Sequence, residues 1–518
     1  MSEASAAPQV GWREWVGFMS MVVGMFMAVL DIQIVSASIS EIQAGLSASP
    51  DEAAWVQTSY LIAEIVMIPL SGWLSRLLST RVLFTASALG FTFFSLLCAT
   101  SSSLGEMVVF RAAQGFLGGA MIPTVFATSY LLFAGRRRTQ MSVLIGLTAT
   151  LAPTIGPTLG GWLTLQFSWH WLFLINVPIG GAVALSVWTF LRIDRPNFAL
   201  LKNIDLIGLA LMALFLGTLE YVLEEGDRWD WFQDPTIAWA GVVTAVAAVG
   251  FFWRMLVRPD PLVDLRAFAN ANFAAGCLFS LIVGLGLYGS VYVTPLFLAR
   301  VRGYDSLQIG ETMFVTGAAM FLSAPIAGWL ARSMDLRAML AMGLLMFGGG
   351  LWWIAHMTVD SAFWDLFGAQ ALRGGAMMFI MLPVNQLALG RLPPEALKNA
   401  SGLYNLMRNL GGAIGLALIN VVATSRMAQH VVHLQEQVTW SRPAATGFID
   451  GLTRLLTAAK SGDAHLAALK QVALMVRQQA LTLTYNDVFM LMAGAFFLAI
   501  PATLLLAKPE PNAVTDAH

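Results

Sequence analysis

Ionisable residues inside otherwise apolar stretches are the first sign of chemistry in this sequence. Asp31 lies within Met-Ala-Val-Leu-Asp-Ile-Gln-Ile-Val, and Glu64 lies midway along a second apolar run. A charge near the bilayer centre costs roughly 2.5–3.5 kcal/mol on insertion scales, so such a residue usually pairs, titrates or faces a cavity. We interpret both as candidate proton sites. The alternatives are a position near the membrane interface for Asp31 and a protonated structural carboxyl for Glu64.

Basic residues also occur inside apolar runs. Arg111, Gln114 and Gly118 share one helical face at i, i+3 and i+7, so Arg111 can offer a cation to an inward carboxylate. We expect Asp31 and Arg111 to form the core of a proton switch; an arginine that snorkels to the interface is the alternative. Candidate substrate contacts are Gln114, Glu220, Arg373 and Arg408. For Glu220 the alternative is that it begins an acidic loop. For Arg373 and Arg408 the alternative is a structural pairing inside the protein.

A stretch rich in proline and glycine is the candidate hinge. It reads Ala-Pro-Thr-Ile-Gly-Pro-Thr-Leu-Gly-Gly and contains Pro153, Gly156, Pro157, Gly160 and Gly161. Gly-x-x-x-Gly spacing lets helices approach closely, and prolines bend a helix. We expect a close-packed, kinked helix that acts as a hinge or a seal.

The elements that position these residues are membrane-spanning helices. Of the 518 residues, 57% are hydrophobic and only 11% charged, against about 25% charged in soluble proteins. Continuous apolar runs of roughly 20 residues exclude barrel strands and predict an all-α polytopic membrane protein. The fourteen expected spans lie near 15–36, 54–74, 82–100, 107–129, 141–164, 171–191, 204–223, 236–256, 273–297, 309–331, 338–356, 363–388, 400–423 and 485–507.

Basic residues set the expected orientation. Alternate short loops, beginning after the second span, hold fifteen lysines and arginines, whereas the intervening short loops hold three. The positive-inside rule places the first set in the cytoplasm, and with fourteen spans both termini are then cytoplasmic. We see no cleavable signal peptide, because the first apolar run is too long and many others follow it.

A pattern also repeats at an offset of 256 residues. The segments 69–81 and 114–121 match 325–337 and 370–377 without gaps. This predicts an N-terminal six-helix bundle (1–200), two inserted helices (201–266) and a C-terminal six-helix bundle (267–518). Transporters built from two such halves bind substrate near the midplane between them.

Other classes of protein fit less well. We find no convergent nucleophile and base, metal triad or phosphate-binding loop, which argues against an enzyme, and we expect no cofactor. The net charge of −1 gives no sign of nucleic-acid binding. Cys98 and Cys277 are interpreted as packing thiols, and His430 and His433 as solvated side chains without a metal. A passive pore and a membrane receptor stay open as alternatives, although the duplication disfavours the receptor.

The segment near 424–484 is the longest expected extracytoplasmic loop. Helical stretches are expected near 447–460 and 463–481, the second capped by Asp463, with apolar residues at helical spacing. These apolar residues need burial, either against a partner protein or against the extracytoplasmic opening of the protein itself.

These motifs together resemble the major facilitator superfamily, in particular the 14-span drug:proton antiporters of the EmrB/QacA type. The segments that carry the resemblance are 30–35, 111–115, 156–161, 171–180 and 223–232. The resemblance implies proton-coupled export of small hydrophobic compounds across a bacterial inner membrane. It also implies work with a membrane-fusion adaptor of the EmrA type and an outer-membrane channel. We expect lipophilic weak acids or drugs as substrates; a specific metabolite such as a fatty acid or siderophore is the alternative.

The sequence departs from the family pattern in two places. Arg76 and Ser79 stand where the loop motif after the second span has Asp and Gly, so the usual charged latch of that loop is not expected. Gln33 and Ser36 replace the Thr and Asn of the first-helix motif. Substrate contacts there, with Gln33 as a candidate, are expected to differ accordingly.

Overall fold

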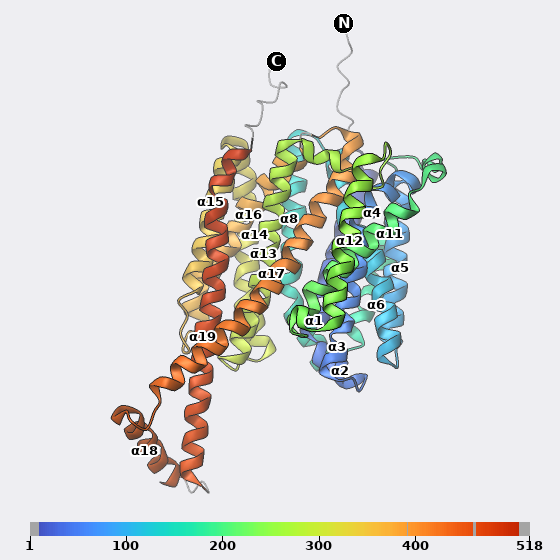
Figure 1. The fold of residues 1–518 in the computed structure, drawn as a ribbon. Coiled ribbons are helices and arrows are strands. Elements are labelled where there is room, and N and C mark those ends of the chain that lie inside the picture. Colours follow the sequence, from blue (N-terminus) through green and yellow to red (C-terminus); the bar gives the residue numbers. More distant parts are fainter. Residues whose placement is uncertain (1–9, 391, 459–462, 507–518) are drawn as a thin grey trace.

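The protein is described here from a computed structural model, which covers residues 10–390, 392–458 and 463–506 (Figure 1). These residues form helices and connecting segments, without a strand among them. The long helices are α1 (Trp12–Ala37), α4 (Trp55–Leu78), α5 (Thr80–Thr100), α6 (Leu104–Gly118), α7 (Met121–Leu132), α8 (Gly135–Gln166), α10 (Asn176–Phe190), α11 (Leu206–Glu225), α12 (Pro235–Val257), α13 (Ala271–Arg300), α14 (Ser306–Ser333), α15 (Leu336–Ile354), α16 (Phe363–Leu389), α17 (Pro394–Gln437), α18 (Pro443–Ala458) and α19 (Ala464–Ala499). Short pieces are α2 (Ile39–Gly45), α3 (Pro50–Ala53), α9 (Trp171–Leu174), η1 (Phe198–Asn203), η2 (Trp231–Gln233), η3 (Leu265–Ala269) and η4 (Pro501–Leu505).

Thirteen candidate spans among the described residues are long and apolar enough to cross a membrane. The fifth expected span, which lies in α8, is not one of the thirteen. However, α8 has 32 residues and packs between α1 and α14, inside the bundle. Two expected spans are interrupted, because α6 gives way to α7 at Gly119 and α9 to α10 at Ile175. The all-helical membrane architecture expected from composition is confirmed.

The helices pack as two halves with an inserted pair. Helices α1 to α10 form the first half, helices α13 to α19 form the second half, and α11 packs on α12 and on α4. The halves repeat each other in detail. Gly118 of α6 faces Tyr60 of α4, and Gly374 of α16 faces Thr316 of α14, which are the same pair 256 residues later. The exact residue limits of the three parts stay predictions.

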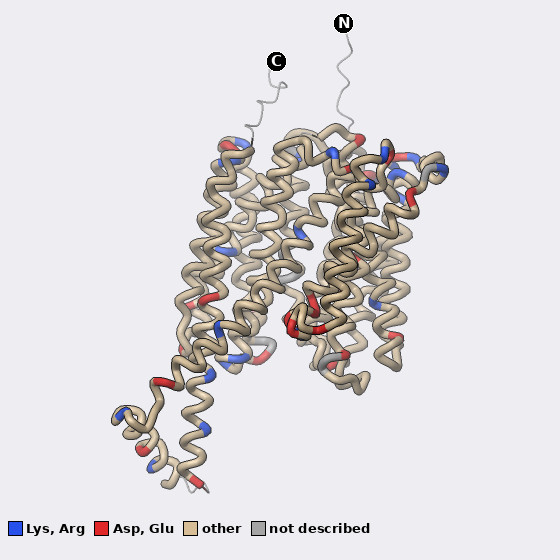
Figure 2. Tube along the Cα trace, in the orientation of Figure 1, with Lys and Arg blue, Asp and Glu red and all other residues tan. Residues whose placement is uncertain are grey.

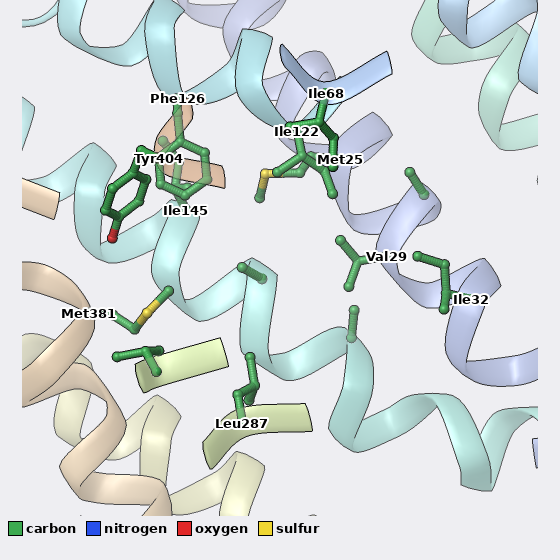
Figure 3. Packing of buried hydrophobic residues seen from close by; sticks show 14 of the residues in the cluster. Met25, Val29, Ile32, Ile68, Ile122, Phe126, Ile145, Leu287, Met381 and Tyr404 are labelled. Atoms are coloured by element: carbon green, nitrogen blue, oxygen red, sulfur yellow. The ribbon is translucent and has the colours of Figure 1, made fainter. Parts of the chain in front are cut away.

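The halves meet at one end of the bundle, here called the termini end, where α1 begins at Trp12 and η4 ends at Leu505 (Figure 1). Tyr130 Oη donates to Asn385 O at 2.7 Å, and Ser401 Oγ donates to Pro123 O at 2.6 Å. Phe126 and Tyr404 place their ring centroids 6.1 Å apart (Figure 3). Polar and apolar contacts between the halves thus close this end.

The opposite end, here called the α18 end, carries a helical projection that leaves the bundle (Figure 1). The segment near 424–484 is not a separate loop, since α17 runs unbroken to Gln437 and α19 begins at Ala464. At about 1.5 Å per residue α17 is about 66 Å long, roughly twice a bilayer core of about 30 Å. Helix α18 packs on α19. The expected cap of α19 is confirmed, because Asp463 Oδ1 accepts from Leu466 N–H at 3.1 Å.

Candidate functional site

A buried ion pair forms the polar centre of the first half. Asp31 on α1 and Arg111 on α6 are both fully buried, and Arg111 Nη1 lies 2.6 Å from Asp31 Oδ2. Arg111 Nη1 also donates to Gln114 Oε1 at 2.8 Å, and its Nε donates to Val56 O at 3.1 Å. The guanidinium stacks 4.2 Å from the Tyr60 ring centroid. The pair therefore links α1, α4 and α6.

Asp31 has two further hydrogen-bond donors. Asn176 Nδ2 donates to Asp31 Oδ1 at 2.7 Å, and Gln114 Nε2 reaches the same oxygen at 3.3 Å. Asn176 Nδ2 also lies 3.1 Å from Ser95 Oγ, which in turn donates to Phe173 O at 2.9 Å. The carboxylate is thus held by donors from α6 and α10 and has no contact with solvent.

Sequence reasoning assigned no role to Asn176, Ser95 or Tyr60. The one available signal for Asn176 was an amide inside the apolar run 171–191. A buried amide must satisfy its donors and acceptor, which makes it a candidate for a polar network. Ser95 and Tyr60 carry no such signal, because serine and tyrosine often occur in helices without belonging to a polar network.

Small residues on α6 make the geometry feasible. A Cβ atom built on Gly115 would lie 2.3 Å from Tyr60 O, so only glycine allows α6 to approach α4 this closely. This close approach brings Arg111, one turn earlier on α6, to the backbone of Val56 and the ring of Tyr60. In the second half Phe367 stands at the position that corresponds to Arg111, and it is Arg373 whose Nη2 lies 3.3 Å from Oγ1 of Thr316, the residue that corresponds to Tyr60.

A cavity of about 360 Å³ lies between the halves, toward the α18 end. Its walls come from α1, α4, α8, α11, α13, α14 and α17, so both halves and the inserted pair contribute. Most of the lining is apolar. The polar lining residues are Gln33, Ser36, Gln57, Glu64, Glu220, Glu224, Tyr288, Tyr292 and Asn409.

The structure separates the predicted residues into two groups. Gln33, Glu64, Pro157 and Glu220 line the cavity. Asp31, Arg111, Gln114, Arg373 and Arg408 are buried outside it. Gln114 therefore lies with the proton-switch candidates, although its expected place was with the substrate contacts.

The two later arginines, Arg373 and Arg408, are buried at different places. Arg373 Nη1 lies 3.4 Å from Thr294 Oγ1. Arg408 Nη2 donates to Asn405 Oδ1 at 2.5 Å, and its guanidinium lies 5.3 Å from the Phe126 ring centroid in the first half. Neither forms an ion pair among the described residues. Arg408 is thus placed at the junction of the halves.

The glycines of the candidate hinge pack α8 against α1. A Cβ atom on Gly156 would lie 2.4 Å from Gln33 Cβ, and one on Gly160 would lie 2.8 Å from Ile34 O. Helix α1 carries Asp31, so α8 is in contact with the helix of the ion pair. Pro157 lines the cavity on the same helix. The side chain of Pro153 is outside the described part, and Gly161 has a half-buried position in α8.

A second ion pair, separate from Asp31–Arg111, bridges the two halves at the termini end. Lys398 of α17 contacts Asp194, on the segment after α10, and donates to Ser75 O of α4 at 3.1 Å. Asp194 also accepts from Thr80 N–H at 3.0 Å and from Thr80 Oγ1 at 2.8 Å, and so caps α5. Lys398 thus joins the second half to two elements of the first half. Sequence reasoning counted Lys398 only as a loop charge and overlooked Asp194.

Histidines and cysteines do not form a metal site in the described part of the chain. His430 is less solvated than expected, because its Nε2 lies 2.9 Å from Asp487 Oδ2 between α17 and α19. Cys98 and Cys277 are free and buried, as expected for packing thiols.

Comparison with known proteins identifies relatives over nearly the whole chain. The model of the Major Facilitator Superfamily matches residues 21–416. The chain is 44% identical to the "Colistin resistance protein EmrB" of Acinetobacter baumannii, over 95% of this chain and 96% of that one. It is 32% identical to the "Multidrug export protein EmrB" of Escherichia coli K12, over 93% of each chain. The crystal structure of the human organic anion transporter MFSD10 (TETRAN) matches in fold, with a TM-score of 0.54, 16% identity, and 93% of this chain and 99% of that chain covered.

Proposed function

This chain belongs to the Major Facilitator Superfamily, and from that premise we propose that it is a proton-coupled antiporter and the pump of a tripartite efflux system. Relatives named for multidrug export and colistin resistance cover nearly its full length, so the chain is an efflux transporter of the EmrB type. Its many apolar helices, together with its family and its EmrB relatives, make it a multi-pass inner-membrane protein. Membership of this family indicates that the chain is a transporter rather than an enzyme.

The termini end is proposed to face the cytoplasm, and the α18 end the periplasm. The support is the excess of lysine and arginine in the loops of the termini end (Figure 2). On this assignment the contacts between the halves close the cytoplasmic side, and the cavity faces the periplasm. The described conformation is then the one that has just released substrate and awaits a proton.

The observation that carries proton coupling is the buried contact of Asp31 with Arg111, Asn176 and Gln114. Protonation of Asp31 removes the charge that these donors stabilise and leaves Arg111 buried without its counter-ion. Breaking a buried pair costs about 3–5 kcal/mol, which is enough to change which packing of α1, α4 and α6 is favoured. Helix α1 also forms one cavity wall, so a shift of α1 acts on the substrate site. Glu64 is the second candidate carrier, because it lines the same cavity from α4.

The test is transport in proteoliposomes under an imposed pH gradient, with wild type, Asp31→Asn and Glu41→Gln. Glu41 is an exposed carboxylate on α2 outside the cavity and serves as the matched control. We expect Asp31→Asn to lose uphill transport while it retains exchange of labelled for unlabelled substrate. Retained exchange shows that the variant is folded. Uphill transport by Asp31→Asn with normal coupling would remove Asp31 from the mechanism, and wild-type transport that an uncoupler does not collapse would indicate a passive facilitator.

The adaptor of the tripartite system is proposed to dock on the projection made by α18 and the neighbouring ends of α17 and α19. Large apolar side chains are exposed there, among them Trp440 at 65%, Phe448 at 52% and Leu455 at 70%. The projection extends away from the bundle and does not cover its mouth (Figure 1). Apolar groups that project beyond the bilayer need burial, and a periplasmic partner can supply it.

Substitution of the exposed face tests docking without removing the projection. We expect Phe448→Ser with Leu455→Ser to abolish co-purification of the adaptor and cellular resistance, with transport in proteoliposomes unchanged. Thr457→Ser, on an exposed residue of the same helix, is the control. Full adaptor binding by the double variant would exclude this face as the docking site.

A further inference from the structure

Arg408 is a buried cation without an acidic partner among the described residues. It is 3% exposed, it forms no ion pair there, and its Nη1 has no hydrogen-bond partner in the same part of the chain. Its hydrogen bond to Asn405 and its stacking on Phe126 both involve neutral groups. A buried cation without a counter-ion is destabilising, and within a membrane span such a residue usually marks a functional position.

The position of Arg408 on α17 is between the cavity and the closed termini end. Tyr404, one turn before it, packs on Phe126 at the closed junction of the halves (Figure 3). Gly412, one turn after it, lines the cavity. Residues four apart lie on one face of a helix, so a path along this face from the cavity to the termini end passes the guanidinium of Arg408.

The junction beyond Arg408 contains a row of hydrogen-bonding groups. Tyr404 Oη donates to Asn385 Oδ1 at 2.6 Å, and Tyr130 Oη donates to Asn385 O at 2.7 Å. All three residues are buried. Tyrosine hydroxyls and asparagine amides both donate and accept hydrogen bonds, and protons can pass along groups of this kind. The junction is therefore narrow but not purely apolar.

A second arginine lies at the other end of this row. Arg138 Nη2 donates to Tyr130 O at 3.3 Å, and its guanidinium lies 5.3 Å from the Tyr130 ring centroid. Positive charge thus stands at both ends, with Arg408 on the cavity side. An arginine in a narrow path excludes protons and other cations by repulsion, and salt screens a buried charge only weakly.

We propose that Arg408 is an electrostatic barrier that stops protons from leaking through the closed junction between the cavity and the termini end. The proposal goes beyond the exchange of substrate for protons, because it concerns protons that move without substrate. It rests on the proposed function in one respect, namely that a proton gradient stands across the closed end. A leak would dissipate the gradient that drives export, which explains a buried cation without a counter-ion at this place.

The test is the proton leak of proteoliposomes that contain a pH-sensitive dye, without substrate, after a pH step at clamped membrane potential. Arg408→Met keeps most of the side-chain length and removes the charge, so the leak rate should rise roughly tenfold or more over wild type. Arg408→Lys loses the planar fork but keeps the charge, and it should leak like wild type. Arg332→Met, on an exposed residue of α14, is the control.

A second variant cancels the charge and keeps the arginine. Asn405→Asp is nearly isosteric and places a carboxylate at the partner of Arg408 Nη2. It gives up the donation from Asn405 Nδ2 to Ser401 O and gains an ion pair. Because the net charge of the barrier falls to zero, the leak should again rise roughly tenfold or more, whereas a purely structural role for Arg408 predicts no leak. Size-exclusion profiles and thermal unfolding show which variants are folded, and this variant decides the question where Arg408→Met is not folded.

The outcomes separate this proposal from the proposed function. A wild-type leak rate in Arg408→Met or in Asn405→Asp, or an equal leak in Arg408→Met and Arg408→Lys, would overturn the barrier. The double variant Asp31→Asn with Arg408→Met should still leak, because protons that cross the junction do not need Asp31. Loss of the leak in the double variant would assign it to idle turnover of the antiporter and also overturn the barrier. Failure of the antiporter itself is read from substrate transport by wild type, which can fail while these leak rates stay as expected.

Discussion

Loss of the Lys398 ammonium is expected to open the termini end of the protein. Lys398 belongs to the second half, and its partners Asp194 and Ser75 belong to the first half. These contacts bridge the halves, so the parting of the halves at this end must break them. Lys398→Met keeps most of the aliphatic length and removes the charge. The variant should therefore raise the population of the state that is open at the termini end.

The size of the effect follows from the burial of the contact. The side chains of Lys398 and Asp194 are 12% and 19% exposed, so the pair is shielded from solvent but still reached by it. Hydrogen bonds to charged groups contribute about 1.5–3 kcal/mol, and partial exposure favours the lower figure. Since about 1.4 kcal/mol is a tenfold change in an equilibrium, the population should rise roughly tenfold.

The assay is the labelling rate of a cysteine that is reachable only when this end opens. Ser401 is fully buried and donates to Pro123 of the other half, so Ser401→Cys reports separation of the halves. The native Cys98 and Cys277 are buried and give a slow background. We expect Lys398→Met to accelerate labelling by a maleimide about tenfold over the Ser401→Cys parent.

Two comparisons decide whether the contact itself is responsible. Lys202→Met removes an exposed lysine from the same end of the molecule and should leave the rate unchanged. Asp194→Asn should accelerate labelling, and its combination with Lys398→Met should add little, because both remove one interaction. Equal rates for Lys398→Met and Lys202→Met, or fully additive effects of Lys398→Met and Asp194→Asn, would refute the reasoning.

Four further changes have defined outcomes. Ser79 has φ +78° and ψ 154°, a backbone conformation that favours glycine. Ser79→Gly should therefore relieve strain of about 1 kcal/mol and raise the unfolding temperature, and an unchanged or lower unfolding temperature would count against strain. Asn176→Ala removes a donor from Asp31 and should weaken uphill transport, with a cost of about 1.5–3 kcal/mol measured as a ratio of rates at fixed pH gradient; wild-type coupling would exclude this role. Gly160→Val drives a side chain into Ile34 O and should destabilise the fold by about 1–3 kcal/mol in thermal unfolding, a result that unaltered stability would contradict. Burial raises the pKa of Asp205, but hydrogen bonds from Gly208 N–H and Arg254 and the charge of Arg258 outweigh it and hold that pKa below its ordinary value. Asp205→Asn should therefore destabilise the protein at pH 7 and less as pH falls through the lowered pKa; an equal loss at pH 7 and pH 3 would contradict this.

Much of the architecture follows from the sequence alone. Continuous apolar runs near 20 residues leave helices as the only way to satisfy backbone groups in a bilayer, and the spacing of Arg111 and Gln114 puts both on one helical face. The low frequency of charge in such runs also singled out Asp31, Glu64 and Glu220. A charged residue is costly inside an apolar membrane span, so its presence there indicates a specific role, and the local sequence is sufficient to find it.

Tertiary structure alone decided which of these residues lie together. Asp31 and Arg111 are 80 residues apart in sequence, and Asn176 is 145 residues from Asp31, so their contact depends on the packing of α1, α6 and α10. Tertiary structure also decided which predicted residues line the cavity and which are buried with the ion pair. Whether a helix face packs inside its own half or points toward the other half depends on the neighbouring helices. Lys398 and Asp194 carry no local signal, since charged residues in short loops are common and solvated. Their role arises only because the closed termini end brings two distant loops together and shields both charges from water.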